Sequence, residues 1–213
     1  MTESIGRRSF AAKVAGLAAG MTLPLASFAQ GRFQEGVNYT RLPSPVAVDS
    51  APGQVEVLEF FAYTCIHCYR FEPDFERWMR KQPVGVVVRR VPVAFNAAME
   101  PLQRLYYALE SMGLVEQLHG KVFAAIHNDK QRLLSAQSIV AWVVAQGVDQ
   151  KAFEMAFNGF SASGKAKRAS QLTAAYGVEG TPALGVAGRF YIPGQGPKSL
   201  DVADDLIVRV RTI

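Results

Sequence analysis

The alternation of hydrophobic and polar residues predicts three strands in the first half of the chain. The strongest is 55–61, Val-Glu-Val-Leu-Glu-Phe-Phe, whose β-branched and aromatic residues leave almost no polar face. Such a run is typical of a central strand that is buried on both faces. Residues 85–95 contain a second apolar run and predict a second central strand, whereas the short alternation at 39–42 ends at Pro43 and fits an edge strand.

Between the two long runs the hydrophobic period changes to that of a helix. Phe71, Phe75 and Trp78 are spaced by three and four residues, which places them on one face of a helix over 65–81. A strand, a helix and a strand in this order form a parallel crossover unit. We therefore expect the two long strands to lie side by side and parallel.

Residues 97–164 show helical periodicity throughout. Four successive segments carry apolar residues at helical spacing, and Asp149 is placed to cap the fourth. These residues are interpreted as core contacts rather than cofactor ligands: Leu102, Leu105, Tyr106 and Leu109; Leu114, Leu118, Val122 and Ile126; Ile139, Val140 and Val143; Phe153 and Phe157.

After a further helix at 165–176, the pattern predicts a hairpin and a final helix. The strand period returns at 183–186 and 190–192, joined across the tight turn Ala187-Gly188. Residues 200–211 are amphipathic with a helical period. The predicted fold class is α/β, with one domain formed by 30–96 and 165–213 and interrupted by an all-helical insert at 97–164.

Composition narrows the class of protein without identifying its function. The chain has 213 residues, of which 49% are hydrophobic, and this suits one folded domain or one domain with an insert. A formal net charge of +5 is too small to imply a nucleic-acid partner. With only two cysteines, the chain is neither a disulfide-rich scaffold nor a zinc ribbon, so no metal site is expected.

The first residues have the order of an export signal. Arg7, Arg8 and Lys13 precede an uncharged apolar stretch at 14–25, and small residues follow at Ser27 and Ala29. We therefore expect a signal peptide over 1–29, cleaved after Ala29, which delivers the chain to an oxidising compartment. An uncleaved membrane anchor is the alternative, but the apolar stretch is short for one. The twin arginines leave the Sec and Tat export routes both open.

The two cysteines lie where the strand at 55–61 gives way to the following helix. A helix N-terminus exposes backbone N–H groups and carries partial positive charge, so it lowers the pKa of a thiol placed there. Cys65 is at the capping position and is predicted to be the exposed nucleophile, with Cys68 one turn deeper. His67 between them can stabilise the thiolate further. Stabilising the thiolate favours the reduced form, which makes the disulfide a stronger oxidant.

Other uses of the cysteine pair fit the sequence less well. A disulfide between residues three apart closes a very small loop and removes little entropy from the unfolded chain. Covalent haem attachment requires a histidine directly after Cys68, where Tyr69 stands. A metal site needs more ligands, and His119 and His127 lack the matching spacing, so both are interpreted as surface residues. Redox chemistry is therefore the favoured interpretation.

Residues 60–69, Phe-Phe-Ala-Tyr-Thr-Cys-Ile-His-Cys-Tyr, followed by Phe71-Glu72-Pro73, resemble the active-site segment of the thioredoxin superfamily. The resemblance is strongest to the DsbA family of periplasmic thiol:disulfide oxidases. It covers nearly the whole chain after the signal peptide, including the helical insert and Gly180-Thr181-Pro182. It implies a thioredoxin fold with an inserted all-helical domain.

The resemblance also implies a chemistry and a set of site residues. Cys65 and Cys68 would form a redox-active disulfide with no other cofactor. Pro182 would be cis and pack beside the disulfide, and Thr181 would offer its backbone to a substrate strand. Glu59, Glu72 and Arg90 match a charged cluster under the active site, in which Glu59 tunes the pair or serves only as a structural partner of Arg90.

Two positions depart from the family pattern and leave the direction of catalysis open. Ile66 stands where most members carry proline, so the redox potential cannot be inferred from the motif. Thr181 replaces the valine common in oxidases and resembles the residue of disulfide isomerases. The leading hypothesis is a monomeric oxidase of unfolded or folding exported polypeptides, reoxidised by a DsbB-like membrane partner. A reductase or isomerase, and a non-catalytic peptide-binding module, are the alternatives.

Overall fold

The computed structural model describes residues 1–2 and 32–212 of the chain. The predicted signal peptide and its cleavage site therefore lie outside the described residues, apart from the first two. Across residues 1–2 and 32–212, no helix combines the length and the apolar character that crossing a membrane requires.

A five-stranded mixed sheet forms the centre of the described body, in the order β1-β5-β4-β2-β3. Strand β2, Val55–Phe61, is buried along its whole length, as its sequence predicts. It pairs in parallel with β3, Val86–Pro92, and antiparallel with β4, Ala183–Val186. Strand β5, Phe190–Ile192, extends the sheet to the short edge strand β1, Thr40–Arg41. The crossover unit and the edge strand are confirmed.

The prediction that β3 is a central strand is wrong. Strand β3 pairs only with β2 and forms one edge of the sheet, and most of its residues are only half-buried. Its apolar run reflects what covers its two faces. Val86 and Val88 pack against the core on one side, whereas Val91 belongs to the core on the other. A hydrophobic run indicates that both faces of a strand are covered, but it does not indicate how many strands pair beside it.

Two helices cover one face of the sheet. They are α1, Ile66–Arg80, and α7, Lys198–Arg211. Alternate residues of β2 point to this face, where Val55 and Val57 meet the buried side of both helices. The cluster is completed by apolar side chains of α1, α7, β4 and β5: Phe71, Phe75, Trp78, Leu184, Val186, Phe190, Ile192, Leu200, Val202, Ala203, Leu206 and Ile207.

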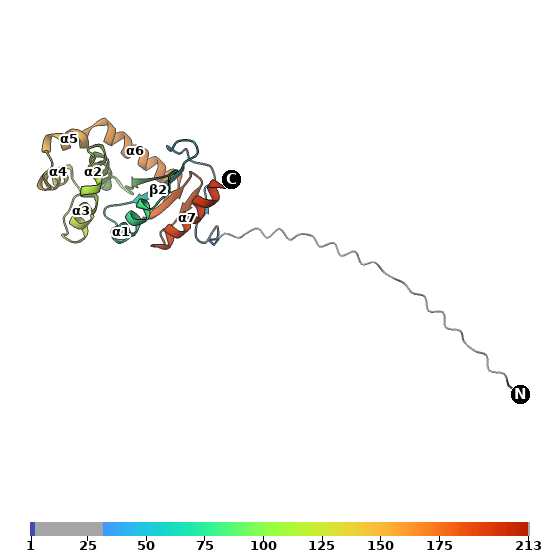
Figure 1. Ribbon diagram of the computed structural model, residues 1–213. Helices are drawn as coiled ribbons and strands as arrows, with labels where there is room; N and C mark the ends of the chain where they lie inside the picture. The colour runs from blue at the N-terminus through green and yellow to red at the C-terminus, as the bar shows by residue number, and fades with distance from the viewer. Residues whose placement is uncertain (3–31, 213) are drawn as a thin grey trace. The chain divides into compact units, whose positions relative to one another are not determined.

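A run of helices lies between β3 and β4, as the sequence predicts. In chain order it comprises the single turn η1, Ala97–Met99, then α2, Glu100–Ser111, α3, Val115–His127, α4, Ala136–Ala145, α5, Gln150–Asn158, and α6, Phe160–Ala175. Figure 1 shows α2 to α5 grouped together at one end of the body, with α6 leading back to the sheet. Asp149 caps α5 as expected, accepting a hydrogen bond from the backbone N–H of Ala152 at 2.8 Å.

Helix α6 begins five residues before the predicted start at Lys165. Gly159 is extended and separates α5 from α6. The face that α6 buries consists largely of alanines, Ala162, Ala166 and Ala169, which pack closely but form no conspicuous hydrophobic stripe. The sequence therefore predicts the helix but places its start too late.

The turn between β4 and β5 has the conformation that the sequence predicts. Ala187 and Gly188 both have positive φ, 54° and 65°, and Arg189 donates its N–H to the Val186 carbonyl at 3.0 Å. At Gly188 a Cβ atom would lie 2.0 Å from the carbonyl oxygen of Val46. Glycine is therefore required there for space as well as for conformation.

Candidate active site

Cys65 caps the N-terminus of α1. The short segment 62–64 leads from β2 into Cys65, whose extended backbone, φ −87° and ψ 114°, stops the helix from beginning earlier. The backbone N–H of Cys68 donates to the Cys65 sulfur at 3.4 Å, which is the interaction of an N-cap side chain. The structure therefore places Cys65 at the capping position that the sequence predicts, half-buried, with both cysteines unbridged.

Hydrogen bonds to its sulfur lower the pKa of Cys65 from 9.0 to about 5. The largest contribution comes from the Cys68 thiol, followed by the Thr181 side chain and the backbone N–H groups of Cys68 and His67. Partial burial opposes ionisation but is outweighed. Each of these donors is stronger toward a thiolate than toward a thiol, so the charged form is favoured.

Cys68 has the opposite environment. Its side chain is fully buried on the inner face of α1, and burial raises the pKa of its thiol far above the ordinary value. Its hydrogen bond to Cys65 acts in the same direction, because Cys68 is the donor. In the reduced pair the proton therefore stays on Cys68 and the negative charge on Cys65.

The reactivity of Cys65 is expected to follow a titration with a midpoint near pH 5. Because the pKa is lowered in the folded protein, the reduced form gains stability that is complete above pH 9 and is lost as the pH falls through 5. Iodoacetamide alkylation and absorbance at 240 nm, measured from pH 3 to 9, test this directly.

The Cys68 thiol provides a matched pair of variants for the same titration. Cys68→Ala removes the donor and should raise the midpoint, whereas Cys68→Ser keeps an O–H donor and should remain close to the parent. An equal midpoint for the alanine and serine variants would contradict the assignment of the Cys68 thiol as the main donor.

Thr181 and Pro182 lie beside the cysteine pair although they are far from it in sequence. Their peptide bond is cis, as the sequence led us to expect. The Cys65 thiol donates to the Thr181 carbonyl at 3.2 Å, across 116 residues of chain. The Thr181 side chain also lowers the pKa of both cysteines, a contact that the sequence did not predict.

A groove of about 680 Å³ begins at this point and runs along the surface beside α1. The exposed side chain of His67 forms part of its wall, and so do Arg70, Phe71, Thr181, Pro182 and Tyr191. The backbone N–H of His67 is among the groups that lower the pKa of Cys65. Ile66 is 38% exposed at the start of α1, in the position between Cys65 and His67.

Glu59, Glu72 and Arg90 come together in the interior, as expected for a charged cluster. Arg90 Nε lies 3.2 Å from Glu59 Oε2, and Arg90 also hydrogen-bonds to Glu72. The Glu59 side chain is 0% exposed, and burial together with the neighbouring Glu72 raises its pKa well above the ordinary value. Burial also opposes ionisation of Glu72, but His119 and Arg90 outweigh it and hold its pKa below the ordinary value.

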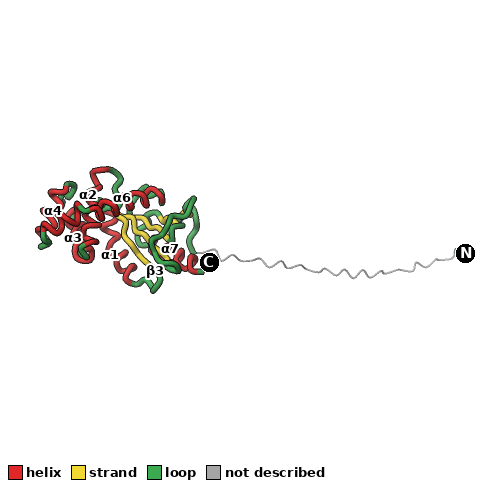
Figure 2. Tube along the Cα trace, turned by 90° about the horizontal axis from the view of Figure 1, so that it is seen from above, coloured by secondary structure: helices red, strands yellow, loops and turns green. Residues whose placement is uncertain are grey.

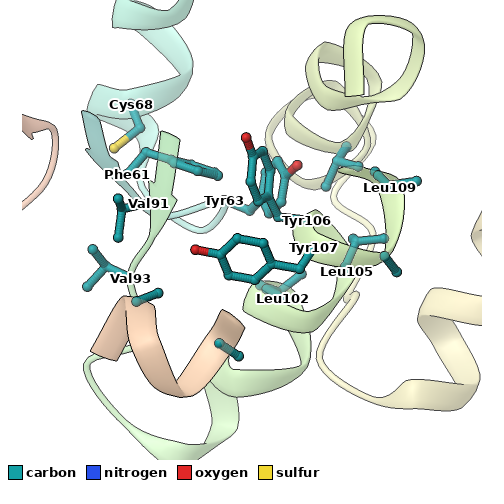
Figure 3. Packing of buried hydrophobic residues seen from close by; sticks show 14 of the residues in the cluster. Phe61, Tyr63, Cys68, Val91, Val93, Leu102, Leu105, Tyr106, Tyr107 and Leu109 are labelled. Carbon is teal, nitrogen blue, oxygen red and sulfur yellow. The ribbon is translucent and has the colours of Figure 1, made fainter. Parts of the chain in front are cut away.

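The interpretation of His119 and His127 as surface residues is wrong. His119 is 2% exposed, and its Nδ1 lies 2.7 Å from the Tyr63 hydroxyl. His127 is half-buried, and its Nε2–H donates to the Tyr63 carbonyl at 2.8 Å. Both therefore contact the segment that leads into Cys65. Figure 3 shows aromatic side chains of this region: Phe61 at the end of β2, Tyr63 in the segment that follows, and Tyr106 on α2. Cys68 lies above Phe61 in this view.

A sequence signal for these histidines exists in their spacing. His119, Phe123 and His127 are four residues apart and lie on one face of α3, where Phe123 packs against Tyr63 with ring centroids 5.0 Å apart. An aromatic residue flanked by two histidines at helical spacing indicates a buried face rather than a solvated one.

Comparison with known proteins gives the family. Residues 56–207 match the sequence profile of the DSBA-like thioredoxin domain. The chain belongs to this family. Similar curated proteins are the thiol:disulfide interchange proteins DsbA of Bordetella parapertussis, 43% identical over 92% of this chain and 94% of the relative, and of Pseudomonas aeruginosa, 37% identical over 84% and 86%.

Solved structures of DsbA proteins agree with the fold described above. The crystal structure of Pseudomonas aeruginosa DsbA superimposes with a TM-score of 0.80 at 35% identity, covering 84% of this chain and 95% of that chain. The structure of DsbA from Xylella fastidiosa gives a TM-score of 0.77 at 27% identity, covering 83% of this chain and 96% of that chain. The predicted thioredoxin fold with a helical insertion is confirmed.

Membership of the DsbA-like family makes the chain a thiol:disulfide oxidoreductase that acts on proteins by thiol–disulfide exchange. Its redox equivalents are carried by a cysteine pair, and the family needs no external cofactor. Across the described part of the chain, no group of three or more His, Cys, Asp or Glu residues could hold a metal ion.

Proposed function

We propose that this DsbA-like chain is a periplasmic oxidase that donates a Cys65–Cys68 disulfide to exported polypeptides while they fold. The observation that carries the proposal is the asymmetry of the pair. Cys65 is accessible with a pKa of about 5, whereas Cys68 is buried with a raised pKa. Stabilising the reduced form in this way makes the disulfide oxidising, because the equilibrium favours transfer of the bond to the substrate.

The exchange proceeds in two displacements. A substrate thiolate attacks the Cys65 sulfur, the bond between Cys65 and Cys68 breaks, and Cys68 leaves and takes up a proton. A second substrate thiolate then attacks the substrate sulfur of the mixed disulfide and releases Cys65 as a thiolate. The substrate loses two electrons and gains a disulfide, and the enzyme is left reduced.

Neighbouring residues have distinct roles in this proposal. Thr181 offers its backbone to an extended substrate segment beside Pro182, and the adjoining groove holds the rest of that segment. Ile66 and His67 adjust the potential from the helix N-terminus. Burial and the neighbouring Glu72 raise the pKa of Glu59, so its carboxyl group can exchange a proton with the interior of the site as Cys68 changes charge.

The remaining parts of the proposal concern the cell rather than the site. Residues 1–29 direct export and are removed after Ala29, which leaves a thioredoxin-like domain over 30–96 and 165–213 with the helical insert 97–164. A DsbB-like membrane protein reoxidises the enzyme, since the chain carries no flavin or nicotinamide motif. The enzyme acts as a monomer.

Equilibration with glutathione tests the direction of catalysis. We expect the purified protein to have a reduction potential well above that of thioredoxin, about −270 mV, and to accelerate disulfide formation in reduced ribonuclease. A potential near the thioredoxin value would instead support a reductase or isomerase on the same fold. The threonine at position 181 is the observation that favours this second candidate, because it resembles the residue of isomerases.

A further inference from the structure

His119 is a buried titratable residue that the exchange steps do not use. It lies on α3 among aromatic rings, with centroid distances of 5.0 Å to Phe61, 5.2 Å to Phe123 and 5.8 Å to Tyr106. A polar imidazole in such surroundings is unfavourable unless its nitrogens have partners. An aromatic or aliphatic residue would fill this position with less difficulty, so its contacts are the feature to explain.

Both ring nitrogens of His119 face a specific group. Nδ1 lies 2.7 Å from the Tyr63 hydroxyl, and Nε2 lies 3.3 Å from Glu72 Oε2. A carboxylate can only accept, so Nε2 carries the proton and Nδ1 accepts the Tyr63 O–H. Burial also lowers the pKa of His119, which keeps the ring neutral in this tautomer.

In the sequence, the two partners of His119 lie on opposite sides of the cysteine pair. Tyr63 is two residues before Cys65, and Glu72 is four residues after Cys68, one helical turn further along the buried face of α1. One imidazole from the inserted helices therefore connects both ends of the active-site segment. The Tyr63 main chain is held as well, by the hydrogen bond from His127.

We propose that His119 is a positioning residue for thiol–disulfide exchange. By accepting from Tyr63 and contacting Glu72, it holds the turn between β2 and α1 in the geometry that surrounds the Cys65 sulfur with hydrogen-bond donors. The inference rests on the proposed exchange at Cys65, and it assigns the inserted helices a part in the redox chemistry of the site.

Two substitutions separate hydrogen bonding from packing. His119→Phe fills the space but leaves the Tyr63 hydroxyl without its acceptor, whereas His119→Gln keeps one acceptor and one donor. In the phenylalanine variant we expect a higher midpoint for Cys65 ionisation and an equilibrium constant with glutathione about threefold to tenfold less oxidising. The glutamine variant should lie close to the parent. Gln117→Ala, an exposed change on the same helix, is the matched control.

The readouts distinguish positioning from a purely structural role. A melting temperature that falls in His119→Phe, with the Cys65 titration and the glutathione equilibrium unchanged, would overturn the proposal. So would a glutamine variant as defective as the phenylalanine variant. If His119→Phe does not fold, Tyr63→Phe removes only the hydroxyl and must shift both readouts in the same direction, and parent-like values there would also overturn it.

Failure of the proposed function gives a different result. If the parent protein does not exchange with glutathione at all, the oxidase assignment fails first and this inference fails with it. If the parent protein is an oxidant and His119→Phe matches it, only the role of His119 is wrong.

Discussion

Replacing Cys65 with serine is expected to reduce the catalysed oxidation of substrate proteins to the uncatalysed background. Cys68, the remaining thiol, is fully buried, and burial raises its pKa, so it offers neither an accessible sulfur nor a thiolate at neutral pH. Reoxidation of reduced ribonuclease measures the activity, and alkylation with iodoacetamide measures the reactivity of the remaining thiol. Both should be lost together.

Cys68→Ser is the matched control because it removes the other sulfur and leaves Cys65 in place. This variant should also lose turnover, but it should retain rapid alkylation. Its Cys65 thiolate should attack a substrate peptide supplied as a thiopyridyl disulfide and release thiopyridine, and the resulting mixed disulfide should persist because no Cys68 thiol can displace the peptide. If Cys65→Ser instead retained the full effect on substrate folding, the protein would be a peptide-binding module and its cysteines incidental.

Replacing Arg90 with methionine is expected to destabilise the folded protein by about 3–5 kcal/mol, because the change leaves a buried carboxylate without its charged partner. The Arg90 side chain is 7% exposed and lies against Glu59 and Glu72, with Glu76 3.9 Å away. Burial raises the pKa of Glu59, whereas His119 and Arg90 hold the pKa of Glu72 below its ordinary value, so the main loss falls on Glu72. Urea unfolding followed by circular dichroism measures the change.

The pH dependence of the unfolding free energy of the same variant tests whether the unpaired Glu72 causes the destabilisation. Without Arg90 the pKa of Glu72 rises above its value in the unfolded chain, so the folded state binds more protons and loses stability as the pH increases. The difference between variant and parent should therefore be smaller at pH 5 than at pH 8. Adding Glu72→Gln to Arg90→Met should recover much of the stability, and a double variant no more stable than the single one would contradict this explanation.

The parts of the site that are contiguous in sequence could be predicted without the structure. A buried strand followed after three residues by Cys65 determines that this thiol caps a helix, because strand, turn and helix form a local unit. The same reasoning placed Cys68 one turn deeper, and the structure shows its side chain fully buried. Pro182 and Thr181 were identified through the resemblance to the DsbA family, since nothing in the intervening sequence predicts their contact with Cys65.

Contacts between distant segments required the tertiary structure. The edge position of β3 depends on which strand pairs beside it, and an apolar run is the same in either position when both faces are covered. The spacing of His119, Phe123 and His127 indicates a buried face, but it does not predict the two partners of His119, because Tyr63 and Glu72 lie on another segment of the chain.

The sequence by itself determined the chemistry of this protein, namely a cysteine pair at a helix N-terminus on an α/β fold with a helical insert. That information is local, because the geometry of a helix terminus depends on adjacent residues. Only the tertiary structure decided how the pair is tuned. Thr181, Arg90 and His119 come from separate elements. Long-range packing alone brings them within hydrogen-bond distance of their partners, which are Cys65, Glu59 and Tyr63 respectively.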